Sequence, residues 1–144
     1  MSGELPAWTR GPLRLPRAVL DAIEAHALAE YPSECCGFIA GPAEDSSLAD
    51  EVTREVNEAD KFHALDRERF PRTSTTYFKI DELRASRKFE AAQTSGRPIK
   101  VIYHSHCDAG AYFSDEDAAT FSSSGQLMWP CAFIVVSVVG GAVR

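Results

Sequence analysis

A short apolar run that ends in two histidines constrains the fold of this chain more than any other feature. Residues 98–103 read Pro-Ile-Lys-Val-Ile-Tyr, and His104-Ser105-His106 follows directly. An apolar run of this length, bounded by turn residues, predicts a buried strand. Residues i and i+2 of a strand point to the same face, roughly 6.6 Å apart along the chain. The fold must therefore bury this strand and present two imidazoles on one face at its end.

Two helices are predicted before this strand. Apolar residues recur at helical spacing between residues 17 and 31, and Pro32 ends the pattern because the residue before a proline avoids the helical conformation. His26 lies inside this helix and is interpreted as an ordinary surface or core histidine. A second helix is predicted from Asp81, which suits the N-cap position, to about residue 95, where Gly96 is a natural stop.

The remaining pattern is mostly β. Further strands are predicted at residues 13–15, 35–40, 51–56, 76–80 and 132–139. Gly140-Gly141 predicts a tight turn after the last of them. Residues 57–76 are charged, contain Pro71 and lack periodicity, so they are predicted to form a long irregular loop, a kind of segment that is often functional or mobile.

This order of elements predicts the α/β or α+β class, with a mixed central β-sheet flanked by helices. A length of 144 residues is typical of one domain. We therefore interpret residues 1–144 as a single domain. Residues 1–11 contain Gly3, Pro6 and Gly11 and are predicted to form a loose N-terminal arm.

Charge and composition exclude several functions. The net charge of −6 argues against the basic face that a nucleic-acid partner would need. No basic segment followed by an apolar run opens the chain, and no stretch has the length of a membrane span, which predicts a cytoplasmic protein without a membrane partner. The four cysteines show no C-x-x-C spacing, and Cys35-Cys36 is interpreted as a pair of small buried residues in one strand.

A cluster of carboxylates follows the histidine pair at a spacing that suits a metal site. Seven residues separate His106 from Ser114-Asp115-Glu116-Asp117, and Ser114 is predicted to begin a short helix. A loop of this length can fold Asp117 back over the two histidines. Two imidazoles, one carboxylate and a fourth position for water are the donors expected of catalytic zinc, although iron, manganese or cobalt would accept the same donors.

Each half of this pattern also has an ordinary structural explanation. An H-x-H pair occurs by chance on exposed strands, and Ser114 with Asp117 loosely fits a helix capping box. Acidic residues also favour a helix N-terminus through the helix dipole. The joint occurrence of the two halves, directly after a buried strand, favours the metal site.

A zinc hydrolase also needs a general base, and Glu34 is the candidate. It lies between the first predicted helix and the strand at residues 35–40. If that strand neighbours the one at residues 99–104, Glu34 lies at the edge of the sheet beside the histidines. The alternative is an exposed glutamate at an ordinary helix–strand junction.

These residues together resemble the JAMM motif of the Mov34/MPN/PAD-1 family, most of all that of its short bacterial members. The family pattern is a Glu near the start of an early strand and then H-[ST]-H-x(7)-S-x-x-D, which Glu34 and the stretch from His104 to Asp117 match at every key position. The resemblance covers most of the chain except residues 42–76 and the ends. It implies the MPN fold, which is similar to that of cytidine deaminases. One departure is Cys107, where many relatives have proline.

The resemblance implies a role for each matching residue. One Zn²⁺ per chain is held by His104, His106 and Asp117. Glu34 holds the attacking water, removes its proton and later protonates the leaving amine. Ser114 donates a hydrogen bond to the oxyanion of the tetrahedral intermediate.

The resemblance also implies a substrate class. Members that keep the full motif are zinc metallopeptidases that cleave peptide or isopeptide bonds after the C-terminal tail of ubiquitin-like proteins. The short bacterial members act on ubiquitin-fold sulfur carriers that end in Gly-Gly, and some remove an added cysteine. The implied partner is therefore a ubiquitin-like sulfur-carrier protein or its C-terminal adduct.

Two other functions are alternatives to a metallopeptidase. Non-catalytic MPN scaffolds, which act as interaction modules, have lost metal ligands, and the complete motif disfavours that alternative. Zinc deaminases need H-x-E together with P-C-x-x-C. Here the first motif is His104-Ser105-His106, and Pro130-Cys131 lacks a second cysteine at the required spacing.

Overall fold

A five-stranded mixed sheet forms the centre of the molecule. A computed structural model describes residues 12–108, 122–123, 126–127 and 131–143. The strand order is β2-β1-β3-β6-β7, in which β3 and β6 run parallel and the other neighbours run antiparallel. The bounds of these strands are Cys36–Ala40 for β1, Glu51–Glu55 for β2, Ile99–Cys107 for β3, Ala132–Val139 for β6 and Ala142–Val143 for β7. Two short strands, β4 (Ser122–Ser123) and β5 (Gln126–Leu127), pair with each other. The predicted mixed central sheet is confirmed.

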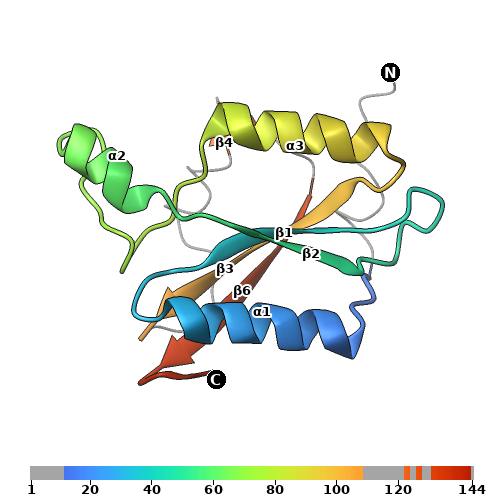
Figure 1. The fold of residues 1–144 in the computed structure, drawn as a ribbon, viewed down its shortest axis with the longest axis horizontal. Coiled ribbons are helices and arrows are strands. Elements are labelled where there is room, and N and C mark those ends of the chain that lie inside the picture. The colour runs from blue at the N-terminus through green and yellow to red at the C-terminus, as the bar shows by residue number, and fades with distance from the viewer. Residues whose placement is uncertain (1–11, 109–121, 124–125, 128–130, 144) are drawn as a thin grey trace.

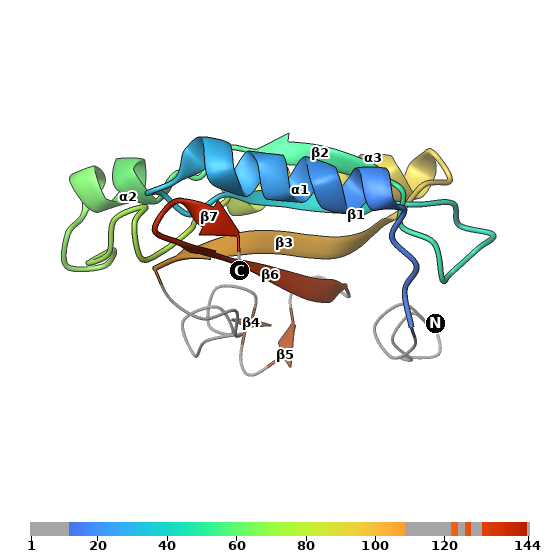
Figure 2. The ribbon, with the colours of Figure 1, turned by 90° about the horizontal axis from the view of Figure 1, so that it is seen from below.

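Two long helices cover opposite faces of this sheet, as Figure 1 and Figure 2 show. α1 (Arg17–Glu30) buries one stripe of side chains against the first face, and α3 (Glu82–Thr94) packs on the second. The first core contains Val19, Ile23, Ala27, Ile39, Val101 and Val138. The second contains Phe38, Phe78, Ile80, Ala85, Ile99 and Ile102. Both helices were predicted, and the periodicity of apolar residues located them because each helix has only one face to bury.

β3 contributes to both cores because its side chains alternate between the two faces. Val101 and Tyr103 point into the core under α1, whereas Ile102 points into the core under α3. Every residue of β3 except Cys107 is buried. The same alternation carries His104 and His106 onto the face that α3 covers, beyond the end of the helix.

A buried polar contact fixes the α1 face. The hydroxyl of Tyr103 and Nδ1 of His26 share a hydrogen bond of 2.7 Å, and both side chains are buried. Burial lowers the pKa of His26, so this ring is neutral at physiological pH. The ring of Tyr103 crosses Gly37, where a Cβ atom would lie 2.4 Å from three of its atoms. Glycine at this position therefore makes room for the contact, and His26 is a core histidine as expected.

The predicted helix and turn signals are also confirmed. The Asp81 side chain accepts hydrogen bonds from the backbone N–H groups of Leu83 and Arg84, which caps α3. Gly96 follows that helix with a φ of 81°, and Gly140 and Gly141 turn β6 into β7 with φ values of 59° and 82°. No helix in the described ranges is both long and apolar enough to span a bilayer.

Two predictions for the middle of the chain were wrong. Residues 57–76 are not irregular throughout, because α2 (Ala59–Leu65) lies within them. Residues 76–80 do not form a strand. Their backbone groups bond instead to Asn57 and Glu58, since Asn57 Nδ2 donates to Tyr77 O and Glu58 N donates to Lys79 O. Tertiary contacts, which periodicity does not reveal, decide both segments.

Three smaller predictions concern the strand at residues 13–15, the N-terminal arm and the short helix from Ser114. The strand at residues 13–15 is reduced to one bridge between Arg14 and Leu48. The N-terminal arm at residues 1–11 and the short helix predicted from Ser114 both lie outside the described residues.

Replacing Gly37 by alanine tests the role of this close approach. The added methyl group would push the Tyr103 ring away from His26, leaving a buried polar group without its partner. We expect the free energy of unfolding to fall by about 2–4 kcal/mol, measured by urea denaturation. In a Tyr103→Leu background the same substitution should cost clearly less, because the ring is gone. An equal cost in both backgrounds would contradict the argument.

Candidate metal site and its supporting contacts

The pairing of β1 with β3 brings the candidate base beside the two histidines. Cys36 lies opposite His104, and the same register places Glu34 opposite His106. The pairing continues to this point, because Ser105 N donates to Cys35 O at 3.1 Å and Cys35 N donates to Ser105 Oγ at 2.8 Å. Residues directly opposite in an antiparallel pair share a face. Glu34, His104 and His106 therefore belong to one face at one end of the sheet.

All three of these residues are buried. The exposed fractions are 6% for Glu34, 0% for His104 and 5% for His106. Buried carboxylates and imidazoles are rare unless something compensates for the loss of hydration. A bound cation is one form of that compensation, beside hydrogen bonds and ion pairs within the protein.

The two imidazoles have a mutual geometry that fits one ion. Their ring centroids are 5.1 Å apart and their planes are tilted by 56°. Zn–N bonds of about 2.0–2.1 Å in tetrahedral geometry leave the centroids of two ligating rings roughly 5 Å apart. Phe78 stacks on His104 with a centroid distance of 4.4 Å and an interplanar angle of 22°. Since Phe78 is itself buried, it restricts the orientation of the His104 ring.

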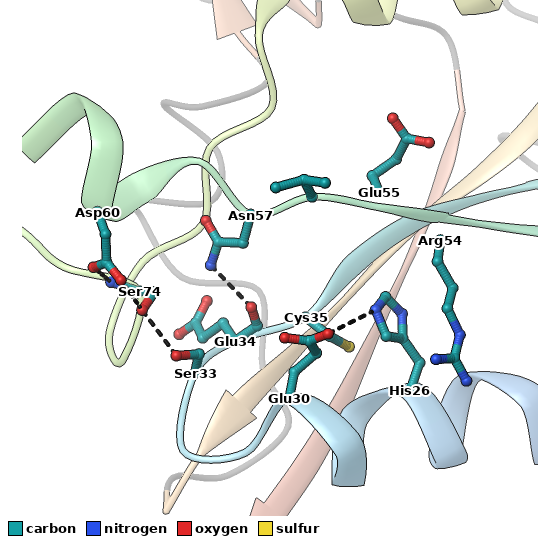
Figure 3. Close-up of a pocket in the computed structure, with 11 residues that line it drawn as sticks. His26, Glu30, Ser33, Glu34, Cys35, Arg54, Glu55, Asn57, Asp60 and Ser74 are labelled. Carbon is teal, nitrogen blue, oxygen red and sulfur yellow. Dashed lines mark hydrogen bonds and ion pairs between the residues drawn. The ribbon is translucent and has the colours of Figure 1, made fainter.

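The backbone of Glu34 is held from both sides by the segment that follows β2. Glu34 N donates to Ser74 O at 2.7 Å, and Asn57 Nδ2 donates to Glu34 O at 2.9 Å. Figure 3 shows Asn57 and Ser74 on either side of Glu34. Glu34 lies before β1, where the ladder of hydrogen bonds between β1 and β2 has ended. The two contacts with Ser74 and Asn57 therefore hold its backbone instead of ladder bonds.

Ser74 is in turn anchored by a carboxylate of α2. Asp60 accepts hydrogen bonds from Ser74 N and Ser74 Oγ, both at 2.8 Å. The two Oγ atoms of Ser33 and Ser74 lie 2.9 Å apart. The hydrogen bonds from Ser74 hold the pKa of Asp60 below its usual value. A chain of contacts therefore leads from α2 through Ser74 to Glu34.

The chain leaves β3 in a fixed direction. Asp108 has a φ of 57°, and its N–H donates to Val138 O at 2.6 Å. Its carboxylate accepts hydrogen bonds from Tyr31 Oη, at 2.7 and 2.9 Å, and from Gly140 N at 2.8 Å. These contacts tie the end of β3 to the β6–β7 turn and to the residue after α1.

Cys107 belongs to the opposite face of β3. As an odd-numbered residue of this strand it alternates with His106, so strand geometry does not aim its thiol with the two imidazoles. Burial raises the pKa of Cys107 to about 11, and the carboxylate of Glu34 acts in the same direction. The thiol is therefore protonated at neutral pH.

A polar hollow of about 370 Å³ opens beside Glu34 on the flank of α1 (Figure 3). Its walls come from the end of α1, the end of β2 and the segment after it. They consist of His26, Glu30, Ser33, Glu34, Cys35, Arg54, Glu55, Val56, Asn57, Asp60 and Ser74. His104 and His106 are not among them, so the hollow adjoins the base and not the histidine pair.

Of the five predicted site residues, His104 and His106 lie with their ring centroids 5.1 Å apart, and the β1–β3 register, continued by two residues, assigns Glu34 to the same face. The other two, Ser114 and Asp117, lie outside the described residues. Within the part of the chain that the structure describes, no group of three or more His, Cys, Asp or Glu side chains could hold a metal ion. Asp117 as the third ligand therefore stays a prediction.

Sequence reasoning missed the supporting residues. Asn57 and Ser74 come from the stretch that lacked periodicity, Phe78 comes from the segment predicted as a strand, and each acts through a tertiary contact. The one available signal was the length of residues 57–76, which suggested a functional segment.

Comparison with known proteins identifies the class. Residues 16–144 match the family described as prokaryotic homologs of the JAB domain, and the chain belongs to that family. This match confirms the resemblance to the JAMM/MPN group and, with the mixed sheet described above, its α+β fold.

Individual relatives are more distant. Proteins named CysO-cysteine peptidase from Mycobacterium bovis and Mycobacterium tuberculosis are 29% identical over 99 residues, which is 69% of this chain and 58% of the relative. The match therefore spans a little over half of those relatives. A solution structure from Desulfitobacterium hafniense is 22% identical with a TM-score of 0.59, covering 85% of this chain and 73% of that one. One from Salinibacter ruber is 27% identical with a TM-score of 0.53, covering 92% and 77%.

The contact between Asp60 and Ser74 predicts a pH-dependent contribution to stability. Because the pKa of Asp60 is lower in the folded state, the contribution is present above the unfolded pKa and disappears as pH falls through the folded pKa. The melting temperature of Asp60→Ala should lie below that of the wild type at pH 7. The gap should narrow only below about pH 4. A gap that stays constant down to the lowest pH at which the protein remains folded would contradict this account.

Proposed function

We propose that this protein is a zinc-dependent peptidase or isopeptidase of the JAMM type. The proposal rests on the burial of Glu34, His104 and His106 and on the β1–β3 register, which, continued by two residues, assigns all three to one face at the end of the sheet. Family membership supports the same reaction class, because the family shares the motif that these residues begin.

The residues present fit a zinc ion. His104 and His106 would hold it together with Asp117, and the spacing of the two rings suits a single ion. When bound, zinc lowers the pKa of a coordinated water to about 7 and polarises a carbonyl group, so that a nucleophile is available at neutral pH.

Glu34 is proposed as the general base. Its backbone is held by two hydrogen bonds, and its carboxylate would receive the proton of the attacking water. It then delivers that proton to the leaving amine. Ser114 is proposed to donate a hydrogen bond to the oxyanion, a contribution typically worth about 2.7–4 kcal/mol of barrier.

The proposed substrate is the C-terminal tail of a ubiquitin-like sulfur-carrier protein that carries an adduct. The relatives named CysO-cysteine peptidase support this class, and so does the family motif. An extended tail could be recognised by pairing with a strand edge, a common mode of peptide binding. A non-catalytic scaffold remains the alternative, which the following measurements distinguish.

The metal site can be tested by zinc content. After dialysis against metal-free buffer we expect about one zinc per wild-type chain, measured by plasma emission spectrometry. Asp117→Ala and His106→Ala should lose it, because each removes one of three ligands. His63→Ala is the matched control, since His63 lies on α2 and contacts Phe70 O. Wild-type protein without zinc, or zinc retained in both ligand variants, would argue against the site.

Replacing Glu34 by glutamine tests the base. The variant should keep its zinc but lose nearly all turnover of a sulfur carrier extended by one cysteine after Gly-Gly, followed by mass spectrometry. Glu30→Gln is the control, because Glu30 lines the same hollow but is exposed at the end of α1. Full activity in Glu34→Gln would show that another group removes the proton. Zinc-loaded wild type that cleaves no carrier would favour the scaffold.

A further inference from the structure

Asn57 uses its whole side-chain amide to join three segments around the site. Its Nδ2 donates to Glu34 O at 2.9 Å and to Tyr77 O at 3.0 Å. Its Oδ1 accepts from Ala59 N at 2.9 Å and from Lys79 N at 3.1 Å. An amide offers two donors and two acceptor lone pairs, and all four are used here. Such complete use leaves the side chain a single position.

Two of these contacts bracket Phe78. The amide holds the carbonyl of the residue before Phe78 and the N–H of the residue after it. Phe78 is the ring that stacks on His104. Asn57 therefore fixes the backbone on both sides of the residue that orients one of the proposed zinc ligands.

The register places Asn57 in line with the site. Since Glu55 lies opposite Cys36, the position two residues further along is opposite Glu34, which in turn lies opposite His106. The β1–β2 ladder ends at the pair of Cys36 and Glu55. Beyond that pair, a hydrogen bond from the side chain of Asn57 to Glu34 replaces the backbone hydrogen bonds of the ladder.

We infer that Asn57 is the positioning residue of this site, which holds Glu34 and the Phe78–His104 stack at a fixed distance from each other. The inference rests on the proposed function, because it assigns Asn57 a purpose in the reaction that Glu34 and His104 would serve. Displacement of a reacting group by about 1 Å can cost on the order of 100-fold in rate, so a residue that couples base and ligand acts on turnover without touching substrate.

Asn57→Asp is the sharpest variant. It preserves size and the acceptor Oδ1, but it replaces the two donated hydrogen bonds with an oxygen that faces two carbonyl groups. Asp66→Asn is the matched control: Asp66 accepts a hydrogen bond from Arg69 N at 3.1 Å in the same segment, away from Glu34. Asn57→Ser, which is smaller and uncharged, replaces Asn57→Asp if the latter does not fold.

Four quantities would be measured on zinc-loaded protein: kcat and KM on the cysteine-extended carrier, zinc content, and hydrogen–deuterium exchange of the peptide that contains Glu34. We expect kcat to fall by about 10- to 100-fold in the Asn57 variant with KM changed less than about threefold and zinc retained. Exchange around Glu34 should rise. The Asp66 variant should change none of these.

These measurements distinguish a failure of the positioning role of Asn57 from a failure of the proposed peptidase function. Unchanged kcat in a folded Asn57 variant would overturn the positioning role, whether or not exchange rises, and so would a loss of turnover that merely follows loss of zinc. If the wild type cleaves no carrier, the proposed substrate fails. Faster exchange around Glu34 in the Asn57 variant alone would then still support the positioning role, and unchanged exchange would overturn it.

Discussion

The antiparallel pairing of β1 with β3 is the interaction on which the rest of the site depends. It sets Cys36 opposite His104, and Ser105 extends it by bonding to both backbone groups of Cys35. A slip of one residue would move the histidines to the other face, against α1. The register is protected because both faces of β3 are buried, so that any slip would exchange apolar and polar side chains across two cores.

The two faces of β3 divide the work between stability and chemistry. On the α1 face, the Tyr103 hydroxyl and His26 Nδ1 share a hydrogen bond over Gly37, which satisfies these two polar atoms inside an apolar core. On the other face, buried imidazoles and a carboxylate lie together, an arrangement that costs free energy unless an ion or a proton compensates. The well-packed face can stabilise the strand, while the opposite face carries the imidazoles and the carboxylate, whose burial costs free energy.

Much of this could be predicted from the sequence, and the failures share one cause. Local signals located α1 by its apolar stripe, α3 by Asp81 and Gly96, and β3 by its apolar run before His104. The pairing of the two buried strands that precede or follow the candidate site residues was also expected and is confirmed. Residues 57–80 could not be predicted, because their structure depends on the side chain of Asn57 and the burial of Phe78, contacts between segments about 20 residues apart that leave no periodic trace.

That failure is informative about how the site is supported. A base at the end of a strand has no ladder to hold it, and here a segment without regular hydrogen bonding supplies the missing contacts through Ser74 and Asn57. Regular secondary structure satisfies its own backbone groups and leaves few free to grip a neighbour. The backbone N–H and C=O groups of the irregular residues 74–79 are not used in a helix or sheet. Some of them form hydrogen bonds with Glu34 and with the side chain of Asn57. The same absence of pattern that hid this segment from sequence analysis is what allows it to hold the candidate base.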